Sequence, residues 1–314
     1  MSKLYFLIGL PASGKSTWAE NNKEKLNFTI HSSDNIRAEL GDINDQSKNE
    51  LVFTTLHKRI KEDLLNGKNV CYDSTGLKRK NRLHFLREIK DIPCEKICVL
   101  FATPIISCRK NNRNRERNVP EEVITRMYKS FEVPCKQEGW NDIQIVWWDW
   151  KKDGLKFNFA DDIEKWKSIS HDNPHHSLSI GHHMIEASKH YSSMCEYYED
   201  WNTEDRLLSM AILMHDCGKT YVKSFYDKDG NLTEKARFYE HHNVGSFLSL
   251  FYLKEMNLYT DNEILYISLL IGLHMRPFLV WKNSDKAKEK DRILFGDEII
   301  KSIELLHECD KLAH

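Results

Sequence analysis

Gly9-Leu10-Pro11-Ala12-Ser13-Gly14-Lys15-Ser16 is the stretch that decides the fold of the first half of this 314-residue chain. It follows an apolar run at residues 3–8 and leads into residues typical of a helix. Glycines at this spacing let backbone N–H groups converge on phosphate oxygens, and the start of the following helix favours a bound anion. The stretch therefore predicts a phosphate-binding loop between a strand and a helix.

The residue types in this loop predict a site for ATP or another NTP together with Mg²⁺. Lys15 is expected to reach the β- and γ-phosphates, and the Ser16 hydroxyl is expected to bind the Mg²⁺ ion. The alternative is a chance glycine-rich turn, which the strand before the loop and the helix after it argue against. The expected nucleotide-binding residues of the loop are Gly9, Ser13, Gly14, Lys15, Ser16 and Thr17.

Outward from the loop, apolar runs alternate with helical patterns through the first 150 residues. We expect strands at 3–8, 28–30, 70–72, 97–101 and 143–148, with helices at 16–22, 47–65, 80–90 and 105–117 and after Pro120. Such alternation predicts an α/β domain with a parallel, doubly wound sheet. After Trp150 the spacing is helical, apart from a hairpin signal at Asp229-Gly230. The sequence thus predicts an α/β domain over residues 1–155 and an all-α domain over residues 165–314.

The bulk composition limits the class of protein. With 30% charged and 40% hydrophobic residues the chain reads as a soluble globular protein, and its net charge of −1 argues against a general polyanion binder but not against a local basic groove. No apolar run approaches the roughly 20 residues that span a bilayer, so no membrane association is expected. The N-terminal apolar run is too short for a signal peptide, and the eight cysteines lack C-x-x-C spacing. We therefore expect reduced thiols in a cytoplasmic protein.

Charged residues beyond the loop predict phosphoryl transfer. Asp34, at the end of the second strand, could accept a proton from an attacking hydroxyl, with a helix N-cap as its alternative role. Arg37 could hold an anionic group of the acceptor, and Asp73 ends the next strand, facing the same crevice. A lid over the donor phosphates, or else a solvated basic helix face, is expected from Arg113, Arg115 and Arg117.

Three segments resemble the kinase domain of phage polynucleotide kinase. They are Gly-x-Pro-x-Ser-Gly-Lys-Ser-Thr-Trp-Ala (9–19), Ser33-Asp34-x-x-Arg37, and Asn118-Val119-Pro120 followed by Arg126-Met127-Tyr128-Lys129-Ser130. That family phosphorylates the 5′-hydroxyl ends of RNA or DNA. The resemblance covers about residues 1–150. It implies that Lys15 and Ser16 bind the NTP, that Asp34 is the general base, that Arg37 contacts the acceptor phosphate, and that a lid arginine contacts the donor phosphates.

Histidines and aspartates of the second half predict a metal site. His215-Asp216 follows the apolar run 210–214, and further imidazoles and a carboxylate recur on other predicted helices. A lone histidine on an apolar helix is usually a core residue, but this recurrence favours ligands. Such donors suit Mn, Fe, Ni, Co or Mg ions better than a thiolate zinc site. The expected ligands of one or two ions are His183, His215, Asp216, His241, His274 and Asp310; His182, His242 and His307 are expected in solvent or supporting positions.

The string His215-Asp216-x-Gly218-Lys219 resembles the HD phosphohydrolase superfamily of all-helical, metal-dependent enzymes. The segment Asn173-Pro174-His175-His176-Ser177-Leu178 is similar to the HD domains attached to bacterial tRNA nucleotidyltransferases, which remove 2′,3′-cyclic, 2′- or 3′-phosphates. The resemblance spans about residues 165–314. It implies that His176 contacts the substrate phosphate. Lys219 is also expected to face that phosphate, as a catalytic residue that neutralises developing charge.

Together the two halves predict a bifunctional enzyme for RNA, or DNA, ends. It would phosphorylate 5′-hydroxyl ends and clear 2′,3′-cyclic phosphate, or a 2′- or 3′-phosphate, from the opposite end. The alternative is a nucleoside or metabolite kinase joined to an HD nucleotidase, which the near-neutral charge favours slightly. A third class is a non-catalytic signalling module, against which Lys15, Asp34, His215, Asp216 and Lys219 speak.

Overall fold

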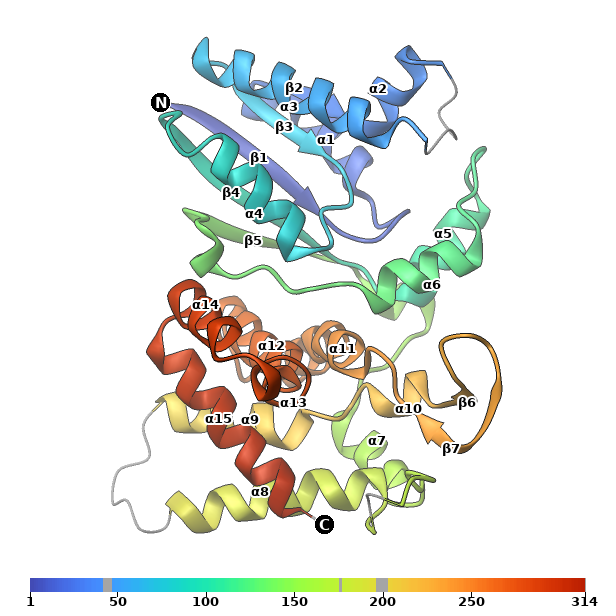
Figure 1. The fold of residues 1–314 in the computed structure, drawn as a ribbon. Helices are drawn as coiled ribbons and strands as arrows, with labels where there is room; N and C mark the ends of the chain where they lie inside the picture. Colours follow the sequence, from blue (N-terminus) through green and yellow to red (C-terminus); the bar gives the residue numbers. More distant parts are fainter. Residues whose placement is uncertain (42–46, 175–176, 196–202, 314) are drawn as a thin grey trace. The chain divides into compact units, whose positions relative to one another are not determined.

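The computed structural model describes residues 1–41, 47–174, 177–195 and 203–313 (Figure 1). The chain divides into two compact units. Unit 1 comprises Met1–Met127 and Pro134–Gly154, and unit 2 comprises Tyr128–Val133 and Leu155–His314. The predicted domains, 1–155 and 165–314, placed residues 128–133 in the first domain, whereas the structure places them in unit 2. This segment packs with unit 2 because the Phe131 ring lies against Phe247, with the ring centroids 4.6 Å apart.

Unit 1 is built on a parallel sheet with the strand order β2-β3-β1-β4-β5, which confirms the predicted doubly wound α/β fold. The strands are β1 (Ser2–Ile8), β2 (Phe28–Ser32), β3 (Asn69–Asp73), β4 (Cys94–Ala102) and β5 (Asp142–Trp147). The helices are α1 (Lys15–Leu26), α2 (Ser33–Glu39), α3 (Asn49–Leu65), α4 (Arg79–Glu88), α5 (Ile105–Arg113) and α6 (Glu121–Lys129). Because β1 is the middle strand, the loop at its carboxyl end lies at the point where ligands bind to such sheets.

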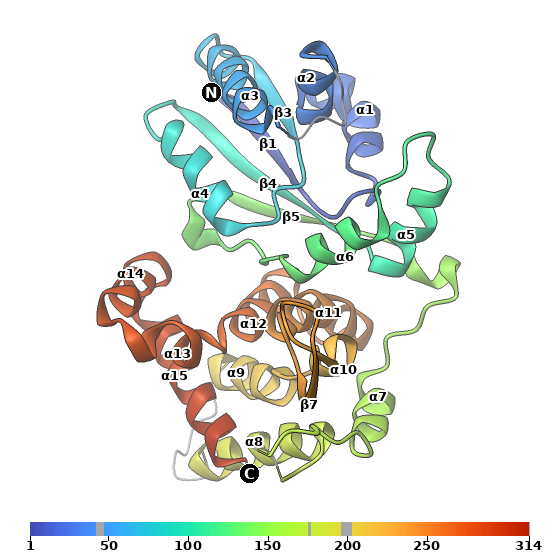
Figure 2. The same ribbon diagram turned by 45° about the vertical axis from the view of Figure 1, so that its right-hand side comes forward.

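Alternate side chains of β1 enter two different cores. Tyr5 and Leu7 pack with Ala19 of α1, whereas the Phe6 ring lies 5.9 Å from that of Phe85 in α4. Figure 2 shows α1 on one face of the sheet and α3 and α4 on the other. Both faces are therefore covered, which explains why β1 reads as a continuous apolar run and not as an alternating one.

A buried ion cluster stabilises the second of these faces. Glu138 accepts hydrogen bonds from Arg82 Nη2 at 2.6 Å and Nε at 2.7 Å, from Arg79 Nε at 3.2 Å and from Trp140 Nε1 at 3.2 Å. Burial acts to raise the pKa of Glu138, but Arg82 and Arg79 outweigh it and lower the pKa below 4.5. Both partners of the Arg82–Glu138 pair are fully buried, so removing one of them leaves the other as an uncompensated charge.

We therefore expect Glu138→Gln to lower the stability of unit 1 by about 3 kcal/mol, measured from the urea unfolding transition. The folded pKa is depressed, so this stability is present above pH 4.5 and is lost as pH falls through the folded value. The difference between wild type and variant should accordingly shrink in acid. Glu62→Gln, at a surface ion pair with Lys58, is the control and should change stability by less than about 1 kcal/mol.

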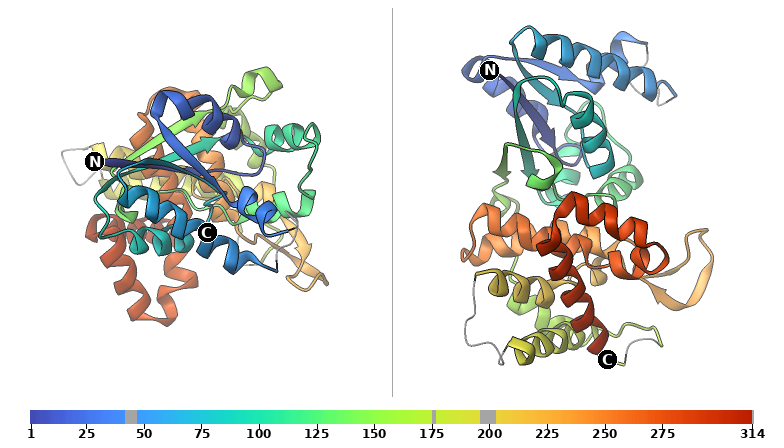
Figure 3. Two further views of the ribbon diagram at one scale, coloured as in Figure 1. Left: turned by 90° about the horizontal axis from the view of Figure 1, so that it is seen from above. Right: turned by 60° about the vertical axis from the view of Figure 1, so that its left-hand side comes forward.

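The described residues of unit 2 are helical apart from one hairpin, as predicted, and an isolated bridge between Ser170 and Ser179. Its helices are α7 (Phe159–Trp166), α8 (Ile180–Cys195), α9 (Thr203–Met214), α10 (Lys219–Val222), α11 (His241–Met256), α12 (Asp261–Leu273), α13 (Arg276–Leu279), α14 (Asp285–Phe295) and α15 (Asp297–Leu312). The antiparallel hairpin pairs β6 (Ser224–Tyr226) with β7 (Leu232–Arg237) around Asp229-Gly230. The right-hand view of Figure 3 shows α15 crossing α9 toward α8. The helices α8, α9 and α15, together with α11 and α12, carry the predicted metal ligands or lead directly into them.

One stretch of the described residues, Asp261–Asn283, is long and apolar enough to pass for a membrane-spanning helix. It is made of α12, α13 and the short 3₁₀ helix Trp281–Asn283, and 56% of its most apolar window is buried inside the protein. Thr260 and Glu263 form a capping box at the start of α12. The apolar character of the stretch is thus accounted for by its place in the core of unit 2.

Candidate active sites in the two units

The phosphate-binding loop joins β1 to α1. Its conformation needs glycine at two positions: Gly14 has φ 97°, and a Cβ on Gly9 would lie 2.7 Å from Ser13 Oγ. Lys15 Nζ donates to the carbonyls of Gly9 at 2.9 Å and Leu10 at 2.7 Å. Burial lowers the pKa of Lys15 against the opposing effect of Asp73. The ammonium group is therefore held at the loop, where a nucleotide phosphate can exchange for the carbonyls.

Ser16 and Asp73 lie together at the edge of this loop. Ser16 Oγ donates to Asp73 Oδ2 at 2.7 Å, and burial raises the pKa of Asp73 above its ordinary value although Lys15 opposes this. A hydroxyl and a carboxylate are the oxygen ligands that Mg²⁺ takes beside a nucleotide. The donor set therefore fits Mg²⁺, and it adds Asp73, which the sequence suggested only as a substrate contact.

A cavity of about 1000 Å³ opens over the loop. Asp34 and Arg37 line it from α2; Arg37 Nη1 lies 3.1 Å from Asp34 Oδ1 and Nη2 donates to Asn49 Oδ1 at 2.6 Å. The N-cap of α2 is Ser32, whose Oγ accepts from the Asp34 N–H at 3.2 Å. The capping alternative for Asp34 is therefore wrong. Its carboxylate, about half exposed, faces the cavity and can take a proton.

The predicted lid arginines divide into two groups. The helix expected at 105–117 ends at Arg113, whose Nη2 lies 3.8 Å from Glu121 Oε1, and Arg113 is not among the residues that line the cavity. Arg115 and Arg117 lie on the following loop and do line it; Arg117 Nη1 is 3.4 Å from Asp34 Oδ2. Arg126, which had no assigned role, lines the cavity as well. Of the glycine-loop residues expected to bind nucleotide, all but Gly9 line the cavity.

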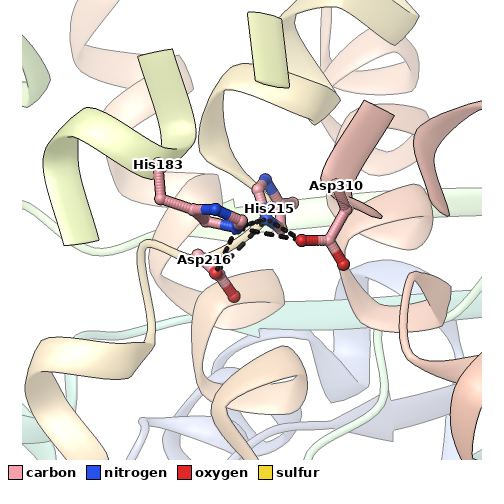
Figure 4. A group of neighbouring side chains, drawn as sticks. All are labelled: His183, His215, Asp216 and Asp310. Atoms are coloured by element: carbon pink, nitrogen blue, oxygen red, sulfur yellow. Dashed lines mark hydrogen bonds and ion pairs between the residues drawn. The ribbon is translucent and has the colours of Figure 1, made fainter. Parts of the chain in front are cut away.

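In unit 2 four predicted ligands converge (Figure 4). His183 comes from α8, His215 and Asp216 follow α9, and Asp310 comes from α15. His183 Nε2 lies 2.9 Å from Asp310 Oδ1 and 3.3 Å from His215 Nε2, and Asp216 Oδ2 lies 3.3 Å from His215 Nε2. Potential ligand atoms of all four residues fall within 4.8 Å of one another.

A second group shares Asp216 with the first. Its other oxygen, Oδ1, lies 3.3 Å from His241 Nε2 and 3.8 Å from His274 Nε2. The two Nε2 atoms are 3.1 Å apart. One carboxylate therefore lies between two clusters of ligand atoms, an arrangement that can hold two ions with Asp216 as the bridge.

The hydrogen bonds around the four imidazoles fit metal binding. Each Nδ1 lies 2.6–2.9 Å from a backbone carbonyl, which can only accept, so each Nδ1 carries the proton and turns Nε2 toward the centre. Burial acts against charge on Asp216, but Lys219 and His215 outweigh it and hold the pKa of Asp216 well below its ordinary range. The site thus offers an ionised carboxylate and inward-facing imidazole nitrogens, which suits a divalent ion.

Lys219 is fixed beside this centre by two partners. Its Nζ lies 2.6 Å from Asp216 Oδ2 and 3.2 Å from His171 Nε2. Burial and Lys219 lower the pKa of His171 to about 4, so its ring is neutral and accepts a hydrogen bond from the ammonium. No sequence pattern indicated His171, which has no metal-ligand spacing to the motif and is found only through its contact with Lys219.

His182, His242 and His307, which were expected in solvent or supporting positions, lie outside the two groups of ligand atoms. His182 Nδ1 lies 2.8 Å from Ser179 Oγ on the exposed side of α8, and burial lowers the pKa of His242 to about 3. Burial also lowers the pKa of His307. His176, the expected phosphate contact, lies outside the described residues.

Gly218 in the His-Asp-x-Gly-Lys string is required by close packing. Its φ is −78°, a conformation that any residue can adopt, so backbone freedom does not explain the glycine. A Cβ there would lie 2.1 Å from the His241 carbonyl oxygen and 2.5 Å from the Gly245 nitrogen. The glycine lets α11, which carries the predicted ligand His241, approach the turn that carries Asp216.

We expect Gly218→Ala to destabilise unit 2 by about 3 kcal/mol, because backbone atoms must move apart, and to reduce metal uptake measured by elemental analysis. Gly272→Ala is the control, since its Cβ would meet only the Ser246 side chain, at 3.0 Å. Equal metal content in Gly218→Ala and wild type would show that the close approach is not needed for the site.

Comparisons with known proteins agree with the division of the chain into an α/β unit and a helical unit. Residues 4–134 match the family described as AAA domain, and residues 180–313 match the family described as HD domain. An L-seryl-tRNA(Sec) kinase from Methanococcus maripaludis is 28% identical over 143 residues, which cover 44% of this chain and 56% of the relative. The chain thus spans little more than half the length of that relative.

Three solved structures show a limited similarity to part of this chain. The Pnkp1/Rnl/Hen1 RNA repair complex is 20% identical over 40% of this chain and 42% of that chain, with a TM-score of 0.36. A putative kinase from Chloroflexus aurantiacus (14% identical, 52% and 93% covered, TM-score 0.41) and a gluconokinase from Sinorhizobium meliloti (14%, 46% and 82%, 0.35) also match.

Proposed function

We propose that this chain, in which a P-loop kinase domain precedes an HD domain, prepares the two ends of a broken RNA strand for joining. Unit 1 phosphorylates a 5′-hydroxyl end with an NTP, and unit 2 removes a 2′,3′-cyclic phosphate, or a 2′- or 3′-phosphate. The observation that carries the proposal is the presence in one chain of two separate clusters of polar side chains, each suited to phosphate chemistry. One has a carboxylate between two arginines beside a phosphate loop, and the other has two His/Asp clusters around a shared aspartate.

In the kinase reaction the 5′-oxygen attacks the γ-phosphorus, the bond from the γ-phosphorus to the β-bridging oxygen breaks, and the NDP leaves. Asp34 accepts the proton of the attacking hydroxyl. Arg37, which is held by Asn49, and Arg117 flank that carboxylate and can bind the phosphate next to the acceptor nucleoside. Lys15 stabilises the charge on the transferred group. The relative that is named for seryl-tRNA supports an acceptor hydroxyl carried by RNA.

In the hydrolytic reaction an oxygen from water bonds to phosphorus, and the bond from phosphorus to the 2′- or 3′-oxygen of ribose breaks. The released ribose oxygen takes a proton. The two His/Asp clusters around Asp216 would hold divalent ions, which would supply hydroxide at neutral pH and neutralise phosphate charge. Lys219, fixed between Asp216 and His171, can neutralise a phosphoryl oxygen.

The two reactions fit one substrate. RNA cleavage that leaves a 2′,3′-cyclic phosphate also leaves a 5′-hydroxyl, and a ligase needs the reverse arrangement, a 5′-phosphate and a 3′-hydroxyl. A small-molecule kinase joined to a nucleotidase would treat two unrelated substrates. The proposed reading therefore explains why the sites occur together.

The test offers one oligoribonucleotide with a 5′-hydroxyl and a 2′,3′-cyclic phosphate, together with ATP, Mg²⁺ and Mn²⁺, and maps both ends by mass spectrometry. The expected products gain a phosphate at the 5′ end and lose the cyclic phosphate at the other. A free nucleoside is offered in parallel with labelled ATP. Transfer of label to the nucleoside alone would overturn the RNA assignment in favour of a metabolite kinase.

A further inference from the structure

A hairpin interrupts the helical fold of unit 2 between two parts of its candidate metal centre. The β6–β7 hairpin begins shortly after Lys219 and ends shortly before the ligand His241. Its root is attached to that centre: the carbonyl of Phe238 accepts from His241 Nδ1 at 2.9 Å, and the Phe238 ring lies 5.5 Å from Lys219 Nζ. The hairpin is thus fixed at the place where the proposed substrate phosphate is bound.

A second set of contacts fixes the hairpin from the other side. Lys223 Nζ donates to the Ser170 carbonyl at 2.6 Å and pairs with Asp172, and the Ala236 N–H donates to the Asp172 carbonyl at 2.9 Å. These residues flank His171, the partner of Lys219. The hairpin therefore has a rigid base and an exposed outer part.

That outer part carries exposed aromatic side chains. Four large aromatic residues in the described part of the chain are exposed, and two of them, Phe225 and Tyr226, lie in β6. Tyr226 is 55% exposed, and its partner across the hairpin, Leu232, is 74% exposed. Such a surface is costly in water and typical of a binding site.

Basic side chains lie on the hairpin as well. Residues 224–237 include three basic and three acidic side chains, and the three basic ones, Lys228, Lys235 and Arg237, are exposed. One of the acids, Asp227, accepts backbone hydrogen bonds from Asp229 and Asn231 and so stabilises the turn. Ser224 pairs with Arg237 and Tyr226 pairs with Leu232, with a register shift between the two pairs. The hairpin therefore combines exposed basic side chains with exposed aromatic and apolar ones.

We propose that the β6–β7 hairpin is an arm that binds the single-stranded RNA leading into the HD site. The inference rests on the proposed function of that site and deepens it, because it makes an oligonucleotide, and not a mononucleotide, its substrate. Bases stack on exposed aromatic rings while basic side chains contact the phosphates, and this mode of binding tolerates any sequence. At roughly 3.3 Å per residue, β7 extends about 20 Å, enough to contact several nucleotides.

The test compares two substrates of the HD site in the full-length protein. One is a 5′-phosphorylated ten-nucleotide RNA with a 2′,3′-cyclic phosphate, and the other is a nucleoside 2′,3′-cyclic phosphate. The variant Phe225→Ala/Tyr226→Ala should lower kcat/KM for the oligonucleotide about tenfold or more, mainly through KM, and leave that for the mononucleotide unchanged. Leu258→Ala, which also removes an exposed apolar side chain of unit 2, is the matched control. An equal loss of kcat/KM on both substrates, or no loss on either, overturns the proposal that the hairpin binds the RNA.

A second measurement does not depend on turnover. A 5′-phosphorylated RNA carrying 4-thiouridine near its 3′ end is photocrosslinked to the protein, and the crosslinked peptides are identified by mass spectrometry. Crosslinks within residues 221–237 support the arm, and crosslinks confined to other parts of unit 2 overturn it. If the wild type hydrolyses neither substrate, the proposed function has failed, and the crosslinks still decide whether the hairpin binds RNA.

Discussion

Replacing Asp216 with asparagine is expected to abolish the phosphohydrolase reaction and to leave the kinase reaction intact. Asp216 places one oxygen in each ligand cluster, so its loss weakens both metal sites at once. Metal ions contribute several kcal/mol to such reactions, which corresponds to a loss of about 10³-fold or more in kcat/KM. We also expect both ions to be lost or weakly held.

Turnover of an oligonucleotide 2′,3′-cyclic phosphate and metal content by elemental analysis measure the two effects. Asp297→Asn is the control, because its carboxylate is exposed at the start of α15. Unchanged kinase activity in Asp216→Asn shows that unit 1 remains folded. A variant that kept full metal content and hydrolysis would exclude the shared-carboxylate arrangement.

Asp34→Asn is expected to lower kcat of the kinase reaction about 10²–10⁴-fold, the range for loss of a general base. The KM for NTP should change little, because the phosphate loop and the Ser16–Asp73 pair are not altered. Hydrolysis of the cyclic phosphate should be unaffected. Transfer of labelled phosphate to a 5′-hydroxyl oligonucleotide measures the effect.

Asp91→Asn, on the exposed turn after α4, is the control for Asp34→Asn. Asparagine retains the shape of the aspartate side chain, so a loss of activity reports on proton transfer more than on packing. If kcat were to stay within a few-fold of the wild type, another group would have to be the base. On the same RNA, Asp34→Asn should lose only phosphorylation of the 5′ end, and Asp216→Asn should lose only removal of the cyclic phosphate from the other end.

Local sequence patterns predicted most of unit 1. Each expected strand and helix is present because apolar runs, glycines and β-branched residues act within a short segment. The error at the end of α5 has a physical reason. Arg115 and Arg117, two positions apart, would face different sides of a continued helix, whereas the loop after Arg113 lets both line the cavity.

The candidate metal centre was predicted residue by residue but not in its arrangement. Imidazoles and carboxylates on apolar helices indicate ligands, yet their spacing cannot show that Asp216 lies between two clusters. Nor could it show the role of Gly218, because the close contact is with His241 and Gly245 on a different helix. His171 was missed for the same reason: its partner Lys219 is near only in the fold.

Because Tyr128–Val133 packs with unit 2 while the residues on both sides of it belong to unit 1, the polypeptide crosses between the units after Met127, after Val133 and after Gly154. Cutting the gene after Gly154 therefore does not yield two complete halves. The fragment from Leu155 onward lacks the Tyr128 and Phe131 rings that pack against Phe247, and it should aggregate when it is produced by itself. Co-produced with fragment 1–154 it should stay in solution, because residues 128–133 of that fragment can pack against Phe247. These six residues would then hold the two fragments together.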